Sequence, residues 1–499
     1  MRMYRFSCGC QYLLLMIAAA MAINCAAHST PHDLSNLTLS QAFEIALRAN
    51  KDIRIATLER DAAEVRVTGA EGEFDPVLFF EAGSGRSDHP FADTGAADTA
   101  ESDLSGGVRT RMQIGTEIEV AAVTEYDRDR VSGTGLNPRY GSELTVTVSQ
   151  NLLKNFGIDI NRTDILVRQN DAKRSAEELR DIIMQTLFDI EQTYWNYYFA
   201  TADLGVRQQQ LHRAEKLIER AEAQVDVGVA APIEITRAQS GAAAQAVDIL
   251  SAENRIDKLY HRLLERMGIL EARQASSVVR LADEPSGDFV AETLDDALAV
   301  AAVSRPGLVR ANLAIDSAGL RERFTSNQRL PGLVLSGDLS LDGLDDDYAA
   351  GTNELRSGDH VSWEVRLMME VPIPNRTARA AYEEAQFEHT QAVVEAEALQ
   401  QTIRLEVMDA FADLQTAAGR IAAALHAREL TAHLLAAEET SFRLGRTDSL
   451  NVLNAQATLA TAQRDELRAR ADYATALANL YRVRGDLLQQ NHIAFLQDY

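Results

Sequence analysis

The chain almost lacks cysteine. Its 499 residues include three cysteines, and all of them, Cys8, Cys10 and Cys25, lie near the N-terminus. The remainder of the chain therefore has no cysteine with which to form a disulfide. This excludes the disulfide-stapled scaffolds that are typical of small secreted domains.

Positive charge and long apolar runs are also scarce. Lys and Arg number 49 against 74 Asp and Glu, so the formal net charge is −25 and the isoelectric point is about 4.8. Phosphates and anionic headgroups repel such a surface, which argues against nucleic acid or an anionic membrane surface as a partner. The mean hydropathy is −0.19. Beyond the N-terminus we find no apolar run of the length that a membrane-spanning helix needs.

The sequence contains no enzyme motif that we can recognise. A glycine-rich phosphate loop, a GxSxG elbow and an HExxH helix are all missing. The ten histidines are scattered, and His426 and His433 are two helical turns apart, which is too far for one ion. The aromatic run from Tyr194 to Tyr198 is more typical of packing at a helix junction than of a ligand site. We therefore expect no catalytic, metal or cofactor site.

The N-terminus has the pattern of a secretory signal peptide. Arg2 and Arg5 precede a short apolar run from Tyr12 to Ile23, and small residues follow. This run is too short to span a membrane, and the flanking charge is correct for a signal. We predict a signal peptide over residues 1–27, with cleavage after Ala27. Lipidation of Cys25 is the alternative, although Asn24 is a poor match to the small residue expected before such a site.

One stretch, Gly445–Gly485, organises the rest of the chain. It reads as a single helix in which two apolar or alanine stripes each recur every seven residues. The stripes start at Leu453 and Ala455, two residues apart, so they face nearly opposite directions at about 100° per residue. Two opposed stripes indicate a helix held between two neighbours, and a strict period of seven favours supercoiling. Gly228–Gly268 repeats the stretch at an offset of 217 without a gap.

A second pair of matching segments shows that the chain is built twice. The predicted helix from Thr38 to Pro76 corresponds to the helix from Thr293 to Pro331 at an offset of 255. Gly and Pro end both helices, as helix-stop rules expect. We therefore divide the chain into a first repeat over 37–285, a second repeat over 293–488 and a C-terminal tail over 489–499. Fixed-period duplication decides the fold more than any single motif does.

Alternating, strand-like sequence follows each of these helices. In the second repeat it forms a predicted hairpin over 333–371, with strands at 333–341 and 361–371 around a polar loop. In the first repeat it extends over 77–153, with flanking strands at 77–85 and 144–152 and a further alternating stretch at 109–124 that we could not place. Strands of roughly ten residues suit a tilted hairpin that crosses a bilayer. Soluble hairpins are the alternative.

Each hairpin leads into a very long predicted helix. Asn161 and Asn375 begin these helices as N-caps, and the helices run to about Val227 and Leu444. Roughly 65 to 70 residues at 1.5 Å each give a length on the order of 100 Å. A globular domain cannot use a helix of this length, whereas a cylinder can.

The residues described so far resemble the TolC family of outer-membrane efflux channels. The resemblance is carried by the duplicated plan, by QNLLKNFG at Gln150–Gly157, by VPIPNR at Val371–Arg376, and by the turns at Gly228 and Gly445. It covers about residues 37–488. It implies a mainly α fold with a β-barrel part. In a homotrimer, two hairpins from each chain would close a twelve-stranded barrel in the outer membrane. The long helices would continue this barrel as a periplasmic tunnel.

The resemblance also implies a function and partners. The expected role is a passive exit duct of a tripartite efflux system that exports small molecules. An inner-membrane pump would supply energy through a periplasmic adaptor protein. One alternative is the duct of a type I protein secretion system, and another is a structural periplasmic coiled coil without a pore. The two matched hairpins argue against the coiled coil.

Finally, the resemblance places the two Gly-led turns at the periplasmic tip. It implies a pore constriction near Glu234, Asn451 and Asn454. Asn occupies two positions that are often acidic in the family, so we expect weak cation block. The alternative is that both Asn residues are ordinary polar helix starts. The expected adaptor-docking residues are Val227, Gly228, Val229, Leu444, Gly445 and Leu450.

Overall fold

The structure is a computed structural model, and it describes residues 36–91, 95–129, 136–228, 231–272, 279–285 and 292–493. The expected signal peptide, with Cys25 and the site after Ala27, lies outside these residues. The chain divides into two compact units, which are described separately. Unit 1 comprises Met1–Ala49, Ile190–Gly287 and Ala424–Ala471; unit 2 comprises Asn50–Asp189, Asp288–Ala423 and Asp472–Tyr499.

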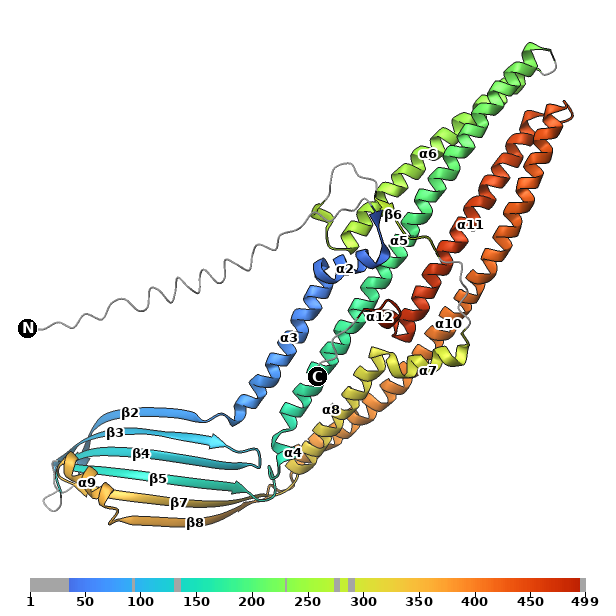
Figure 1. Cartoon of the computed structure of the whole chain (residues 1–499). Coiled ribbons are helices and arrows are strands. Elements are labelled where there is room, and N and C mark those ends of the chain that lie inside the picture. Colours follow the sequence, from blue (N-terminus) through green and yellow to red (C-terminus); the bar gives the residue numbers. More distant parts are fainter. Residues whose placement is uncertain are drawn as a thin grey trace, which may run out of the picture. The chain divides into compact units, whose positions relative to one another are not determined.

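Four helices form the two long helical pairs of the chain (Figure 1). They are α5 (Thr163–Asp226), α6 (Ile233–Arg266), α10 (Arg376–Arg443) and α11 (Ser449–Arg484). The helices α5 and α10 have 64 and 68 residues, so each is on the order of 100 Å long at 1.5 Å per residue. Their ends are within a few residues of the ends predicted from the sequence.

The remaining helices and the minor sheet are short. They are β1 (Asn36–Leu37), α2 (Leu39–Ala49), α3 (Lys51–Glu71), α4 (Ile158–Asn161), β6 (Arg280–Leu281), α7 (Leu294–Ser304), α8 (Pro306–Gln328), α9 (Tyr348–Ser357) and α12 (Leu487–Gln490), with 3-10 turns at Gly72–Phe74 and Leu270–Ala272. In unit 1, β1 and β6 pair as a two-stranded parallel sheet.

Each of the two predicted helices that precede the strands is in fact broken into two. Asn50 separates α2 from α3 with an extended backbone, and its side chain accepts hydrogen bonds from the N–H groups of Asp52 and Ile53. Arg305 separates α7 from α8, because the residue before a proline is pushed out of the helical region. The two breaks occupy equivalent positions, at the same offset of 255. The sequence prediction of unbroken helices was therefore wrong at both positions.

No single helix in the described part of the chain has both the length and the apolar composition of a membrane span. The helices α7 and α8 together reach these values, but they are bent by 44° at their junction.

Unit 2 contains one antiparallel sheet of six strands (Figure 1). In spatial order the strands are β2 (Val77–Phe91), β3 (Gly95–Arg111), β4 (Thr116–Asp129), β5 (Arg139–Asn151), β7 (Gly332–Asp345) and β8 (Val361–Glu370). The prediction of two hairpins per chain was therefore one hairpin short. The stretch 109–124, which we could not place, contains the end of β3 and most of β4. The polar loop predicted between β7 and β8 contains α9, which Asp347 caps.

The sheet has one apolar and one largely polar face, and the pairing register continues the apolar face across all six strands. One row of directly paired residues is entirely apolar: Leu78, Val108, Val120, Val146, Leu339 and Trp363. A row on the opposite face begins at Val77 of β2 and is polar in the other five strands: Arg109, Glu119, Thr147, Asp338 and Glu364. Successive side chains of a strand point to opposite faces, so this pattern follows from the alternation in the sequence.

The sheet of a single chain is open. The strands β2 and β8 lie at its two edges, and within the described residues neither has a partner on its outer side. The barrel expected from the resemblance was to be closed by three chains, and the sheet of one chain does not test this closure.

Candidate functional site at the helix turns

The turns at the ends of α5 and α10 share one backbone design, and both lie in unit 1. Gly228 and Gly445 have φ values of 74° and 66°, which lie in the left-handed region that side chains other than glycine rarely adopt. The N–H of Gly228 donates to the carbonyl of Val225 at 2.9 Å, and that of Gly445 donates to the carbonyl of Phe442 at 3.0 Å. These bonds satisfy carbonyls that the helix ends would otherwise leave free.

Apolar side chains around the turns remain exposed. Val227, Leu444 and Leu450 have exposed fractions of 73%, 62% and 46%. Val229 lies outside the described residues. Three exposed apolar side chains beside two turns form an apolar surface that could pack against another protein.

A small apolar core beneath the turns joins the two helical pairs. It contains Leu217, Ala238, Leu435, Phe442, Val452, Ala455 and Leu459. These residues come from α5, α6, α10 and α11, so both repeats contribute to one core. The side-chain amide of Gln224 also donates to the carbonyl of Phe442 at 3.3 Å. The core holds the helix ends, and with them the turns, in place.

Glu234 is buried, and it connects the two repeats. One of its carboxylate oxygens, Oε2, accepts hydrogen bonds from the backbone N–H of Ser449, at 3.1 Å, and from the Ser449 hydroxyl. The other oxygen, Oε1, accepts from Arg237 at 2.7 Å. Ser449 is the first residue of α11 and is fully buried. Glu234 therefore caps the N-terminus of α11, where the helix dipole favours a negative charge. The sequence comparison aligns equivalent positions of the two repeats. It therefore could not reveal a contact between Glu234 of one repeat and Ser449 of the other.

We expect Glu234→Ala to loosen the start of α11. The substitution removes charge-assisted hydrogen bonds and leaves Ser449 buried without its partner, at a cost of about 1–3 kcal/mol. Hydrogen exchange should accelerate in the first turn of α11, while exchange in the middle of α5 stays unchanged. Glu253→Gln is the matched control, because Glu253 is exposed on the same helix as Glu234. Unchanged exchange at Ser449–Val452 in the alanine variant would contradict the capping role.

Asn451 and Asn454 differ from Glu234 in being exposed on the first turns of α11. The Asn451 side chain donates to the Thr447 hydroxyl at 2.9 Å. Its backbone N–H donates to the Asp448 carboxylate at 3.1 Å. Asp448 is therefore a further acidic group at this helix start, which the sequence comparison between repeats did not identify. In one chain, Asn451 and Asn454 are open to solvent, whereas Glu234 faces Ser449.

The aromatic run in α5 anchors the minor sheet of unit 1. The Tyr194 hydroxyl lies 3.0 Å from the carbonyl oxygen of Leu37 and 3.1 Å from the Asp283 carboxylate. The Tyr197 hydroxyl donates to the carbonyl of Val279 at 3.0 Å. Burial raises the pKa of Tyr197 from 10 to about 12, so the hydroxyl remains a donor well into the alkaline range. Both tyrosines therefore hold the segments that contain β1 and β6 against α5.

Glu191, one turn before this anchor, is a buried carboxyl group with an altered pKa. Burial raises its pKa from 4.5 to about 7, and the hydrogen bond from the Trp195 indole opposes this only in part. Its Oε2 atom has no hydrogen-bond partner among the described residues. Because the folded state favours the protonated form, this group stabilises the fold below pH 4.5 and loses this effect as the pH rises to about 7.

We therefore expect Glu191→Gln to stabilise the protein at pH 8 by up to about 3 kcal/mol, since each pKa unit corresponds to about 1.4 kcal/mol. The gain should shrink as the pH falls from 7 towards 4.5, because the native carboxyl is protonated there. Urea unfolding at several pH values measures this difference. Glu222→Gln, at an exposed position on the same helix, is the control. An equal gain at pH 5 and pH 8 would contradict the assignment.

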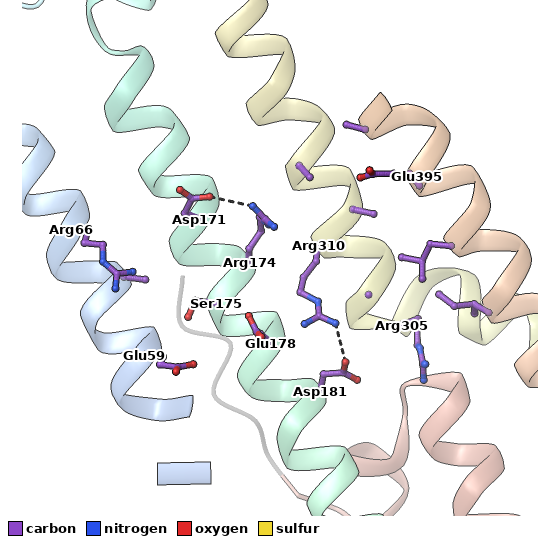
Figure 2. A pocket seen from close by; sticks show the side chains of 18 residues that line it. Glu59, Arg66, Asp171, Arg174, Ser175, Glu178, Asp181, Arg305, Arg310 and Glu395 are labelled. Carbon is purple, nitrogen blue, oxygen red and sulfur yellow. Dashed lines mark hydrogen bonds and ion pairs between the residues drawn. The ribbon is translucent and has the colours of Figure 1, made fainter. Parts of the chain in front are cut away.

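Unit 2 has a polar hollow of about 740 Å³ between α3, α5, α8 and α10 (Figure 2). Arginines and carboxylates of these helices alternate around it. Arg310 pairs with Asp181 at 2.9 Å, and Arg174 pairs with Asp171 at 3.3 Å. Because both signs of charge are present and partly paired, the hollow does not select a ligand by charge. The pair of Arg310 and Asp181 instead fastens α8 to α5.

The described residues contain no group of three or more His, Cys, Asp or Glu side chains that could hold a metal ion. His389 contacts Glu322 at 2.7 Å, between α10 and α8. His360, directly before β8, contacts Glu354 of α9 at 3.1 Å. In this part of the chain these histidines take part in structural pairs.

Comparison with known proteins finds a family match in the second repeat. The sequence profile described as "Outer membrane efflux protein" matches residues 297–486, which is most of the second repeat. Over these residues the chain matches the outer membrane efflux protein family. This confirms the resemblance to TolC-like channels and the location in the outer membrane.

One similar sequence and several solved structures of the same fold accompany this match. The outer membrane efflux protein BepC of Brucella suis is 23% identical over 330 residues, which cover 65% of this chain and 68% of BepC. The crystal structure of CusC, in a study of its transmembrane channel formation, has a TM-score of 0.67 at 17% identity, covering 90% of this chain and 92% of CusC. The CmeC outer membrane channel of Campylobacter jejuni has a TM-score of 0.64 at 15% identity, covering 92% and 88%.

Proposed function

We propose that this protein is the passive exit duct of a tripartite efflux system that exports small molecules. Three copies would form a channel whose barrel crosses the outer membrane and whose long helices form a periplasmic tunnel. An inner-membrane pump would supply the energy through a periplasmic adaptor. The duct would carry out no catalytic step and need no cofactor.

The observation that carries this proposal is the pair of faces on the sheet. A sheet in contact with lipid must be apolar on that side, and one that encloses water must be polar on the other. The apolar row from Leu78 to Trp363 and the polar row from Arg109 to Glu364 meet both requirements. Closure of the open edges by further copies would satisfy their backbone groups, as lipid requires.

Aromatic residues add support at one end of this apolar face. Tyr126 and Tyr140 are paired across β4 and β5, with ring centroids 5.1 Å apart. The ring of Tyr348 on α9 packs against Tyr140 at 6.3 Å. Tyrosines with an apolar body and a polar hydroxyl concentrate at the membrane–water boundary. This cluster would mark the outer boundary of the membrane.

Purified protein in planar bilayers tests the channel. We expect ohmic conductance without nucleotide, and cation preference in a salt gradient. The polar face carries Glu101, Asp103, Glu119, Glu125, Glu143, Asp338, Asp342 and Glu364, but few basic residues. Rings of carboxylates favour cations. Cross-linking in native membranes should capture an adaptor protein. Absence of conductance from correctly inserted protein would overturn the proposal.

The tip residues lead to a prediction about cation block. If Asn451 and Asn454 line the constriction, three copies of Asn451→Asp with Asn454→Asp would add a ring of carboxylates. Divalent cations added to the periplasmic side should then block the channel at least tenfold more strongly than in the native protein. Thr461→Asp, at an exposed position further along α11, is the control. Equal block in all three proteins would place the constriction elsewhere.

A further inference from the structure

The hairpin formed by β3 and β4 distinguishes this chain from the two-hairpin plan expected from its sequence. It lies between β2 and β5, and pairs with both along most of its length. A surface flap would leave β2 paired directly with β5. The register shows instead that β2 reaches β5 only through β3 and β4.

The faces of this hairpin continue those of the rest of the sheet. Val108 and Val120 pair with each other and extend the apolar row between Leu78 and Val146. On the opposite face, Glu119 pairs with Arg109 and with Thr147. The hairpin thus has an apolar side and a polar side in the same register as its neighbours. A hairpin outside the membrane would have no need of this continuity.

The side chains of the apolar row on the two edge strands are more exposed than those on the inner strands, as expected if each edge lacks a neighbouring strand. Along the apolar row, the edge residues Leu78 and Trp363 have exposed fractions of 81% and 76%. The inner residues Val108, Val120 and Leu339 have fractions of 43%, 40% and 46%. Each inner side chain has neighbours from two flanking strands, whereas each edge side chain has one. A strand placed beside β2 and another beside β8 would remove this difference.

The direction of the edge strands allows copies of the chain to supply these neighbours. All five pairings in the sheet are antiparallel. Because the number of strands is even, β8 runs opposite to β2. The β8 edge of one copy can therefore pair with the β2 edge of the next in the same antiparallel sense. Such a head-to-tail contact produces a ring when the rotation closes.

We infer that the transmembrane barrel of this protein has eighteen strands, six from each of three copies, with β3 and β4 as part of its wall. The inference rests on the proposed function for the number of copies, and on the described sheet for the six strands per copy. Barrel radius increases roughly in proportion to strand number, so the barrel would be about one and a half times as wide as a twelve-stranded one. Barrels of 16–18 strands enclose an open aqueous channel. The outer mouth would therefore admit larger solutes than a two-hairpin relative.

Cysteine labelling of the full-length protein tests whether β3 and β4 lie in the wall. The only native cysteines are Cys8, Cys10 and Cys25, so single cysteines can be placed freely. A charged, water-soluble thiol reagent should label Glu119→Cys and leave Val120→Cys unlabelled in membranes. The same contrast is expected on β3, between Asp103→Cys and Leu104→Cys. Equal labelling of both members of each pair would overturn the inference, because a solvated hairpin exposes both faces.

Disulfide formation between copies tests whether β2 of one copy pairs with β8 of the next. Phe80→Cys on β2 is combined in turn with cysteines at Val361, Trp363, Val365, Leu367 and Met369 of β8. At least one pair should link neighbouring copies, and native mass spectrometry of the cross-linked species should show three copies. Oligomers of two copies would overturn the count of eighteen strands. The inference would also be overturned if none of the cysteine pairs formed a disulfide in an oligomer that still conducts ions.

Deletion of the hairpin formed by β3 and β4 tests the predicted width of the barrel. Deletion of residues 95–129 joins β2 to β5 and keeps the apolar faces aligned, because Leu78 and Val146 stand in the same row. Polymer exclusion from the outer side should give a barrel radius about one third smaller than in the native protein, since four strands per copy then remain. If the size of the excluded polymer does not change, the inference of eighteen strands is overturned, whereas the proposed function is not. Absence of conductance from the native protein would overturn the proposed function with it.

Discussion

Replacing Gly485 by alanine is expected to destabilise the protein by about 3 kcal/mol or more. Gly485 follows the last residue of α11 and has a φ of 84°, where a residue with a Cβ costs roughly 1–2 kcal/mol. A Cβ at this position would also lie 2.6 Å from the carbonyl oxygen of Ser304. That atom belongs to the backbone and cannot rotate away, so α11 and the junction of α7 and α8 would have to separate.

The surroundings of Gly485 make such a separation costly. Its carbonyl accepts a hydrogen bond from the buried Arg180 at 3.1 Å. Arg305, at the junction, donates to the carbonyl of Arg482 at 3.0 Å and pairs with Glu406. A shift of the chain would weaken these bonds together. The urea midpoint measures the loss, and the yield of membrane-inserted oligomer should fall in parallel.

Gly419→Ala is the matched control for this prediction. Gly419 lies within α10 in the same unit, and a Cβ there would meet no atom within 4 Å. Alanine in an exposed helix interior should be neutral or stabilising by about 0.5–1 kcal/mol. If Gly485→Ala and Gly419→Ala unfold at the same urea concentration, the close contact with Ser304 is not part of the folded protein.

The local signals in the sequence were sufficient for the four long helices and for part of the sheet. Gly228 and Gly445 end α5 and α10 because glycine readily adopts the positive φ that the turns need. Val361–Glu370 alternates clearly and forms β8. The strand β3 was harder to identify, because its sequence GAADTAESDLSGGVRTR is rich in Gly, Ala, Ser and Asp, which rank low in strand propensity. Pairing with β2 and β4 on both sides overrides that propensity, and such pairing is not local information.

Contacts between the two repeats were the second feature that could not be predicted from the sequence. Glu234 was chosen as a tip residue by its place in the repeat, yet its partner Ser449 is more than 200 residues away. Asn50 and Arg305 interrupt helices for different reasons, one through a side-chain cap and the other through the following proline. A comparison of matching positions detects identical residues more readily than equivalent conformations. The pore constriction, the adaptor surface and the signal peptide remain predictions.

Replacing Gly228 and Gly445 together by valine is expected to lower export at least tenfold while membrane-inserted oligomers still form. Valine is branched at Cβ and strongly disfavours the φ values of 74° and 66° found at these turns. Each turn would therefore change its path and move Val227 and Leu444, two of the proposed adaptor-docking residues. The sheet belongs to unit 2, which contains neither glycine, so barrel assembly should be preserved. Export assays in cells and cross-linking to the adaptor measure the effect.

Asparagine at the same two positions shows whether export depends on the conformation of the turns or on glycine itself. Asn is the residue other than glycine that most readily adopts left-handed backbone conformations at helix ends. The doubly substituted asparagine variant should therefore keep the turns and retain most of the export and adaptor cross-linking. Valine and asparagine variants that both export normally would show that the adaptor docks elsewhere. If both lose export while the oligomer forms, the glycines themselves contact the partner, because asparagine preserves the turn but adds a side chain to its surface.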